Sequence, residues 1–188
     1  MDDLGVLAAE ADTGSLFEGQ DIRATGQRSW WVLYTMSRQE KALERYLTAK
    51  RVPHYLPLHT KHALRRNRRV SYVVPLFSSY VFLYGDPGER IVALTSNRVA
   101  RTIEVPDWRQ EEFGSNLLSI QRLIESGVPL TVESRIQAGA RVRVRSGRLA
   151  GLEGVVITRR RKSQLVVAVD FLQQGASIEV DDFALEVV

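Results

Sequence analysis

Residues 74–86 have the sequence VPLFSSYVFLYGD. Side chains alternate between the two faces of an extended strand, so Phe77 and Leu83 are expected on one face and Tyr80 and Phe82 on the other. Both faces are then apolar, whereas a strand with one solvated face alternates apolar and polar residues. The stretch therefore predicts a strand that is either covered on both faces within its domain or open on one face to a partner.

The residues before this strand predict the start of a layered domain. SWWVLYT at 29–35 is an aromatic and β-branched run, typical of a buried strand. Residues 37–40 have the spacing of a capping box, and apolar residues at helical spacing continue it to a break before Pro53. HYLPLHTKHAL at 54–64 predicts an extended segment, and LRRNRRVSYVV at 64–74 predicts a charged hairpin tip leading into the strand.

The residues after the strand complete the pattern. Asp86 and Pro87 predict a helix start, with an aspartate N-cap and proline at the first helical position. ARTIEV at 100–105 predicts a further strand, and Pro106 opens an amphipathic helix that ends near Gly127. The order β-α-β-β-α-β-α predicts an α+β fold, a sandwich in which helices cover a small sheet.

The last part of the chain has a different pattern. Residues 128–137, VPLTVESRIQ, contain proline and polar residues without a long period, which predicts a linker. Residues 138–188 form short strand-like segments separated by Gly- and Gln-rich turns, without a helical period. This pattern predicts a second domain, a small closed β-barrel. Its many valines favour strands over helices.

Composition limits the function classes. The 188 residues contain no cysteine, which excludes disulfides and cysteine metal sites, and the chain has no apolar run long enough to span a membrane. Residues 1–27 have no signal-peptide pattern and are rich in small and acidic residues, which predicts a mobile arm on a cytoplasmic protein. Without residues 1–25, the chain has 25 basic and 16 acidic residues, a net charge of +9 against +4 for the whole. Such a basic body indicates contact with nucleic acid or an acidic protein surface.

Two motifs resemble known domains. The spacing GxxVxVxxGxxxGxxGxV at 139–156 resembles the KOW motif, which forms a small SH3-like barrel in its families. WWVLYTMSRQEKALERYL at 30–47, followed by VPHYLPL and PLFSSYVFL, resembles the N-terminal (NGN) domain of NusG-family transcription elongation factors. The aromatic PLFSSYVFL and the long hairpin before it are similar to specialised paralogues such as RfaH. The resemblance divides the chain into an acidic arm at 1–27, an NGN domain at 28–127, a linker at 128–137 and a KOW domain at 138–188.

The resemblance implies a non-enzymatic regulator of transcription elongation and antitermination. Its NGN domain would bind the clamp helices of RNA polymerase and suppress pausing, while its KOW domain would recruit the ribosomal protein NusE, the termination factor Rho or RNA. It implies a cytoplasmic monomer with no cofactor, no metal and no membrane contact. An alternative is a general RNA-binding or ribosome-associated protein that uses its basic KOW barrel.

Candidate site residues follow from matching motif positions. The polymerase pocket would include Tyr34, Phe77, Tyr80 and Phe82, and a bulge near Ser78-Ser79 is needed for the three aromatic residues of 74–86 to converge. Some of these residues could equally be plain core. The first helix would lie near non-template DNA, and the hairpin along the polymerase cleft with DNA or nascent RNA. The nucleic-acid candidates are Arg38, Gln39, Tyr46, Lys50, Arg65, Arg66, Arg68, Arg69 and Arg98, each of which could also be an ordinary solvated side chain.

Three further groups of residues complete the interpretation. Phe171 and Leu172 match the turn through which the family's KOW domains bind partners. Glu89, Arg90 and Ile91 stand approximately where the specialised paralogue has a triplet that contacts the opposite cleft wall, so that contact is not expected here, although a salt bridge from Glu89 or Arg90 could replace it. Among the histidines, His54, His59 and His62 lack nearby cysteine or carboxylate ligands, which argues against a metal site.

Overall fold

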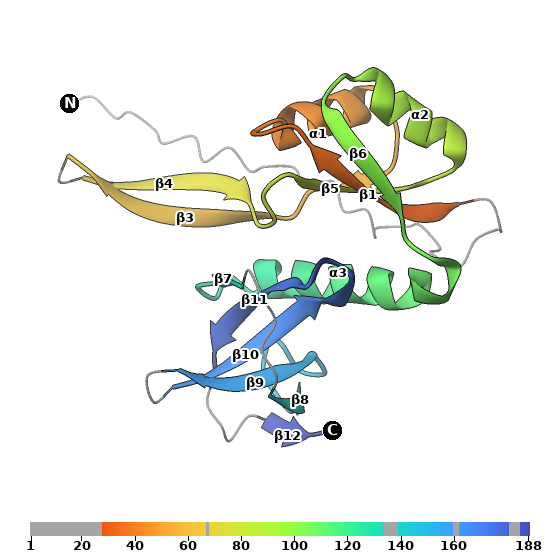
Figure 1. The fold of residues 1–188 in the computed structure, drawn as a ribbon. Coiled ribbons are helices and arrows are strands. Elements are labelled where there is room, and N and C mark those ends of the chain that lie inside the picture. The colour runs from red at the N-terminus through yellow and green to blue at the C-terminus, as the bar shows by residue number, and fades with distance from the viewer. Residues whose placement is uncertain (1–27, 67, 134–138, 160–161, 181–184) are drawn as a thin grey trace.

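The computed structural model describes residues 28–188 apart from 67, 134–138, 160–161 and 181–184. The predicted acidic arm at 1–27 therefore lies outside the described residues. The first sheet has the strand order β2-β5-β1-β6 (Figure 1). Its strands are β1 (Ser29–Thr35), β2 (His54–Tyr55), β5 (Tyr80–Gly85) and β6 (Val99–Glu104).

Helices cover both faces of this sheet (Figure 1). Helices α1 (Glu40–Ala49) and α2 (Pro87–Thr95) pack on one face around Leu33 and Val81. A 3-10 turn, η1 (Asp107–Arg109), leads into α3 (Gln110–Glu125), which covers the opposite face around Phe82. Of the two interpretations of 74–86, the structure therefore shows a strand covered on both faces within the chain.

The continuous strand predicted over 74–86 is wrong. Strand β4 ends at Pro75, and β5 begins only at Tyr80. Between them the chain turns, with Ser79 at a φ of 66° and the amide of Tyr80 donating to the Phe77 carbonyl at 3.3 Å. A turn therefore replaces the predicted bulge, and it brings the Phe77 ring within 6.1 Å of the Phe82 ring on one face of the sheet.

Glu40 explains how this turn is held. The predicted capping box at 37–40 does not form, because Gln39 is the N-cap and makes no side-chain cap hydrogen bond. The Glu40 carboxylate instead accepts a hydrogen bond from the Ser79 amide at 2.7 Å. The predicted cap of α2 is confirmed, since Asp86 and Glu89 form a complete capping box with proline at the start of the helix.

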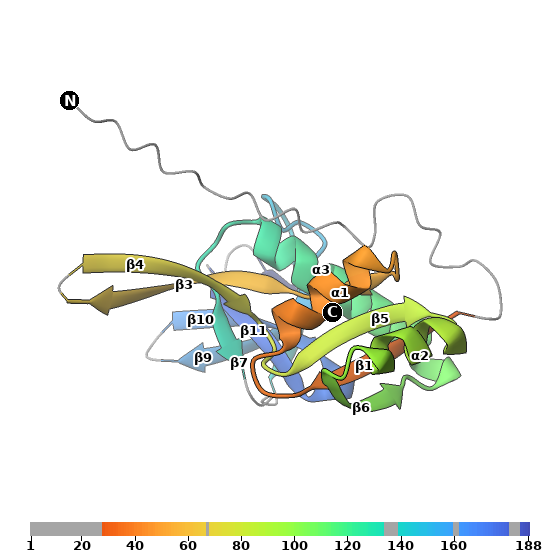
Figure 2. The same ribbon diagram turned by 90° about the horizontal axis from the view of Figure 1, so that it is seen from above.

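A long hairpin extends from the body of the molecule (Figure 2). Its strands β3 (Leu58–Arg65) and β4 (Arg68–Pro75) form a separate two-stranded sheet. The ladder runs from the pair Leu58–Pro75 at the base to Arg65–Arg68 at the tip. Most side chains beyond the base are exposed, so the hairpin has little core of its own.

The C-terminal part forms a second, antiparallel sheet with the strand order β12-β8-β9-β10-β11-β7. Its elements are β7 (Thr131–Glu133), β8 (Ala140–Val144), β9 (Glu153–Arg159), β10 (Lys162–Val169), the 3-10 turn η2 (Asp170–Leu172), β11 (Gln174–Glu179) and β12 (Leu185–Val187). Thr131–Glu133, which fall within the predicted linker, thus pair with β11 as a strand. The preference of the valine-rich segments for strands is confirmed in the described residues.

The glycine spacing of this sheet has a steric cause. A Cβ atom on Gly154 would lie 2.5 Å from the Val166 carbonyl oxygen on the neighbouring strand, so a side chain there would push the strands apart. Gly151 has a φ of 79°, in the left-handed region that glycine adopts without strain.

Helix α3 joins the two sheets. It packs against the first sheet and also against β10 of the second (Figure 1). The Phe113 ring on α3 meets the Phe171 ring on η2 at 5.7 Å in a T-shaped arrangement. Arg122, also on α3, donates a hydrogen bond to the Ala150 carbonyl at 2.7 Å. None of the described helices is both long and apolar enough to cross a membrane.

Candidate functional site

A pair of tyrosines reaches the surface at the end of strands β1 and β5. Tyr34 and Tyr80 are direct partners in the β1–β5 ladder, and their rings meet at 5.4 Å in a T-shaped arrangement. Tyr34 is 36% exposed, and the Arg101 guanidinium lies 5.6 Å from its ring centre. Tyr80 is half-buried and packs against the core beneath α3. The pair thus combines an exposed ring, Tyr34, with a half-buried ring, Tyr80, that packs on the core.

The other two predicted pocket residues lie in the core. Phe77 is 1% exposed and Phe82 is fully buried. The Phe82 ring meets Phe113 of α3 at 5.6 Å, and Phe113 in turn meets Phe171. The four predicted aromatic residues therefore share one face of the sheet, but only the two tyrosines are accessible, since Phe77 and Phe82 are buried in the core with α3. Phe77 and Phe82 support the tyrosine pair from behind.

The predicted nucleic-acid residues around α1 are spread out. Arg38 precedes the helix and Lys50 follows it, so the roughly 15 Å length of α1 separates them. Tyr46 is half-buried, with its hydroxyl 3.1 Å from Thr95 Oγ1 and the Lys50 ammonium 5.8 Å from its ring centre. Arg98 donates to the Ser96 carbonyl at 2.8 Å. Tyr46 and Arg98 are thus engaged within the fold, whereas Arg38 and Lys50 are exposed.

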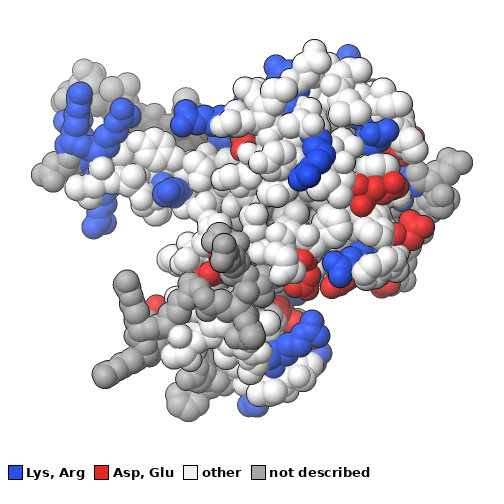
Figure 3. All heavy atoms as spheres, in the orientation of Figure 1, with Lys and Arg blue, Asp and Glu red and all other residues white. Residues whose placement is uncertain are grey.

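The predicted arginines at the hairpin tip are gathered and exposed. Arg65 and Arg68 face each other as the last pair of the ladder, and Arg66 and Arg69 adjoin them. Among the described residues, no ion pair neutralises any of the four. On its visible face, Figure 3 shows basic side chains at the outer end of the hairpin with no acidic side chain beside them.

A groove separates the hairpin base from α3 and β7. Its volume is about 1290 Å³. Three cations line it, Lys61 from the hairpin with Arg38 and Lys41 from the start of α1, among apolar residues such as Val74 and Ile124. Partial burial and the neighbouring Lys61 lower the pKa of His59, which also lines the groove.

Several structural contacts were not evident from sequence. The Lys41 ammonium donates to the Val73 carbonyl at 2.6 Å and ties the hairpin to α1. Glu89, considered above for a cleft contact, accepts from Arg28 at 2.9 Å and from the Asp86 amide at 2.9 Å, so its carboxylate serves the fold. The Arg90 guanidinium lies 5.2 Å from the Trp31 ring centre. Apart from the Asp86–Glu89 bond, which belongs to the capping box of α2, these contacts join residues distant in sequence, for which no local motif gives a signal.

The predicted partner residues of the second sheet lie on η2. Phe171 and Leu172 are half-buried and pack against the continuous core that includes α3. The contact between Phe113 and Phe171 therefore links a predicted partner-binding residue to the aromatic residues of the first sheet.

Known proteins show similarity to this chain. The family model described as "Transcription termination factor nusG" matches residues 28–135. A solved structure on domain interaction in Thermotoga maritima NusG matches with 18% identity and a TM-score of 0.44, covering 86% of this chain and 98% of that one. A structure of the MjSpt4:Spt5 complex matches with 14% identity and a TM-score of 0.27, covering 85% of this chain and 97% of that one. The comparison with curated proteins found no match.

Proposed function

The chain belongs to the NusG family of transcription factors, whose model matches residues 28–135, and we propose that it regulates transcript elongation by binding RNA polymerase. It acts in the cytoplasm as a monomer, without enzymatic activity or a cofactor. Its NGN domain at 28–127 binds the polymerase clamp helices and suppresses pausing. A linker at 128–137, which includes β7, connects it to a KOW domain at 138–188 with an SH3-like barrel.

The tyrosine pair is the polymerase contact in this proposal. Tyr34 and Tyr80 present aromatic surface at the rim of a buried aromatic cluster. Exposed aromatic side chains that are already ordered provide contact area at low entropic cost, which is why they dominate many interfaces. Phe77 and Phe82 act indirectly, because they hold the Tyr80 end of β5 against α3.

The basic residues contact nucleic acid. Arg38 and Lys50 are exposed around α1 and suit phosphates of the non-template strand, while Gln39, Tyr46 and Arg98 shape that surface. The tip residues Arg65, Arg66, Arg68 and Arg69 are exposed and free of ion pairs within the described part of the chain. Each such cation that neutralises a phosphate releases a counterion, so binding weakens as salt rises.

The KOW domain recruits a partner through Phe171 and Leu172. The partner is ribosomal protein NusE, Rho or RNA, and its recruitment couples elongation to translation, termination or antitermination. Because Phe171 packs on Phe113, a protein partner at this turn competes with α3 for the same ring. A partner that takes the face of the Phe171 ring covered by Phe113 therefore displaces η2 from α3.

The observation that carries the proposal is the exposed Tyr34–Tyr80 pair on a family-matched domain. The test is binding of the full-length protein to core RNA polymerase, with a Tyr34→Ala, Tyr80→Ala double variant. Trp108→Ala is the matched control, because Trp108 is an aromatic residue that is 75% exposed on η1, away from the pair. We expect the double variant to lose at least about tenfold in affinity and the control to bind as the parent does.

A second candidate function is a general RNA-binding or ribosome-associated protein. Arg141, exposed on β8, favours it together with the hairpin tip, whereas Arg145 just after β8 is ion-paired with Glu186 at 3.8 Å. This function predicts RNA binding without polymerase binding. Absence of polymerase binding by the folded full-length chain would replace the first proposal with this one.

A further inference from the structure

The β3–β4 hairpin has two faces of different chemistry. Directly paired residues of an antiparallel ladder share a face, and successive pairs alternate between the faces. One face, here called the basic face, is formed by the pairs His59–Val74, Lys61–Tyr72, Ala63–Val70 and Arg65–Arg68. The opposite face is formed by Leu58–Pro75, Thr60–Val73, His62–Ser71 and Leu64–Arg69. The hydrogen bond between His62 Nδ1 and Ser71 Oγ at 2.9 Å confirms this pairing.

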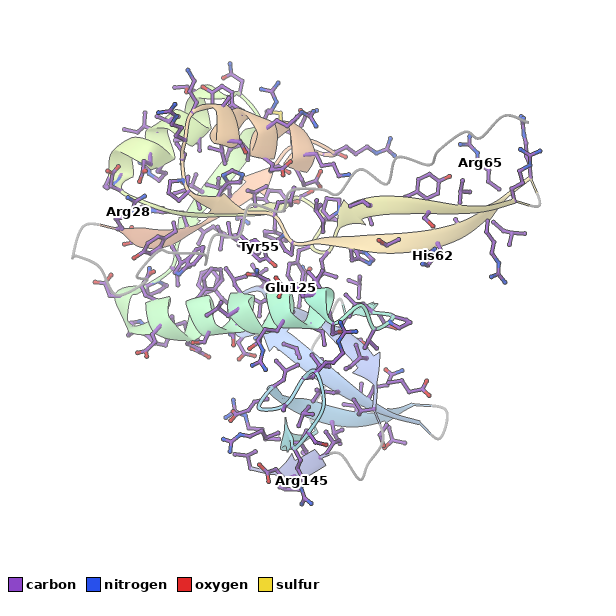
Figure 4. All side chains as sticks on the ribbon, turned by 180° about the vertical axis from the view of Figure 1, so that it is seen from behind. Arg28, Tyr55, His62, Arg65, Glu125 and Arg145 are labelled. Carbon is purple, nitrogen blue, oxygen red and sulfur yellow. The ribbon has the colours of Figure 1, made fainter. Side chains whose placement is uncertain are left out.

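The charges concentrate on the basic face. Lys61, Arg65 and Arg68 lie on it, whereas Arg69 is the one lysine or arginine of the paired residues on the opposite face. Arg65 and Arg68 stand directly across from each other, an arrangement of like charges that destabilises a sheet. Figure 4 shows Arg65 at the outer end of the hairpin and His62 nearer the body. An arrangement that costs stability at an exposed position points to an anionic ligand that neutralises it.

An exposed aromatic ring accompanies these charges. Tyr72 is 40% exposed and is the direct ladder partner of Lys61. Along the strand, Tyr72 lies about 13 Å from Arg68, because two-residue steps on one face measure about 6.7 Å. The pair Ala63–Val70 lies between them, and its side chains are shorter than those of the flanking pairs. A purely solubilising role explains the charges of an exposed hairpin, but it does not explain an exposed tyrosine in their midst.

We propose that the basic face binds single-stranded nucleic acid, with a base stacked on Tyr72 and phosphates contacting Lys61, Arg65 and Arg68. Stacking on an aromatic ring requires a base whose face is free, which selects a single strand over a duplex. The inference deepens the proposed function, on which it rests for the presence of nucleic acid near the hairpin. RNA and DNA single strands share this chemistry, so both are included in the test.

The test measures binding of the full-length protein to fluorescein-labelled oligo-uridine RNA, oligo-thymidine DNA and a DNA duplex by fluorescence anisotropy at low salt. Tyr72→Ala is compared with Tyr72→Phe, which keeps the ring. An Arg65→Gln, Arg68→Gln double variant on the basic face is compared with Arg66→Gln, Arg69→Gln. Both double variants remove two charges from the tip, so net charge is matched between them.

We expect Tyr72→Ala to weaken single-strand binding about 5-fold or more, and Tyr72→Phe to bind as the parent does. The Arg65→Gln, Arg68→Gln variant should weaken binding and reduce the slope of log K against log salt by about 1.4, while the matched variant changes both less. Stronger binding of RNA than DNA would assign the ligand to the transcript, and the reverse to the displaced DNA strand.

Three results would overturn the inference: equal losses in the two double variants, no effect of Tyr72→Ala, or equal or tighter binding of the duplex. Equal losses would show that the tip acts through net charge alone. Because the assay contains no polymerase, its failure leaves the tyrosine-pair proposal standing. Conversely, loss of polymerase binding in the Tyr34→Ala, Tyr80→Ala variant leaves this result unaffected.

Discussion

Substitution of Glu40 tests how the Phe77–Tyr80 turn is held. The Glu40 carboxylate is 7% exposed at the residue level and accepts the Ser79 amide proton across 2.7 Å. Ser79 has a φ of 66°, which a residue with a side chain adopts only when its surroundings enforce it. A hydrogen bond to a charged group contributes about 1.5–3 kcal/mol, and its loss here leaves the partly buried Ser79 amide without this acceptor. Glu40→Ala should therefore lower the free energy of unfolding by about 1.5–3 kcal/mol.

The assay is urea and thermal unfolding of the full-length protein, followed by circular dichroism. For a protein of this size the loss corresponds to a decrease in Tm of roughly 3–12 °C. Glu44→Ala on the same helix is the control, because Glu44 is half-buried and substitution away from such a bond changes stability by only about 0.5 kcal/mol. Ser79→Gly should restore part of the loss in the Glu40→Ala background, since glycine adopts a positive φ freely. Equal stability of the Glu40→Ala and Glu44→Ala variants would refute the reasoning.

Three other predictions concern the core, the contact between the sheets and the acidic arm. Burial, with a smaller contribution from Glu125, raises the pKa of Tyr55 well above its usual range (Figure 4), so the folded state disfavours the tyrosinate. The free energy of unfolding should therefore fall by about 1.4 kcal/mol per pH unit above pH 10, because Tyr55 ionises there only in the unfolded state. Urea unfolding at several pH values measures this slope, which should be shallower in Tyr55→Phe. Phe171→Ala removes the ring that meets Phe113 at 5.7 Å. Amide hydrogen exchange should therefore become faster in η2, while the β1 and β5 amides keep their protection. Unchanged exchange in η2 would show that the contact does not stabilise this turn. Residues 1–25 carry six acidic residues and one arginine. If this arm masks the basic surface, its deletion should strengthen nucleic-acid binding at low salt, where charges are least screened. Unchanged affinity would disprove masking.

Local patterns predicted the order of elements but not the contacts between distant ones. The α2 cap formed as predicted because Asp86, Pro87 and Glu89 act on one another within a single turn. The break at 76–79 was missed because large apolar residues on both sides of the two serines resemble a continuous strand. Glu40 was assigned to a local cap, although its partner Ser79 lies 39 residues away, and nothing in the helix spacing indicates that bond.

For the candidate site, the residues could be named from the sequence, but their burial could not. The family resemblance grouped the four aromatic residues, whereas strand alternation alone put Phe77 on the opposite face; the structure brings all four to one face of the sheet. The sequence could not show that α3 covers Phe77 and Phe82, because an amphipathic helix does not reveal which sheet face it packs against. The contact of Phe113 with Phe171 was likewise hidden, since it joins helix α3 to the turn η2, which lie far apart in the sequence.

The most direct test of the central claim is the affinity of the full-length protein for core RNA polymerase, measured by biolayer interferometry with the parent, the Tyr34→Ala, Tyr80→Ala variant and Trp108→Ala. Tyr34→Glu is included because Tyr34 is the more exposed of the pair, so a charge there disturbs the interface without entering the core. The account predicts that both tyrosine variants lose at least about tenfold in affinity while remaining folded, and that Trp108→Ala binds as the parent does. Parent-like binding by the two folded tyrosine variants would contradict it.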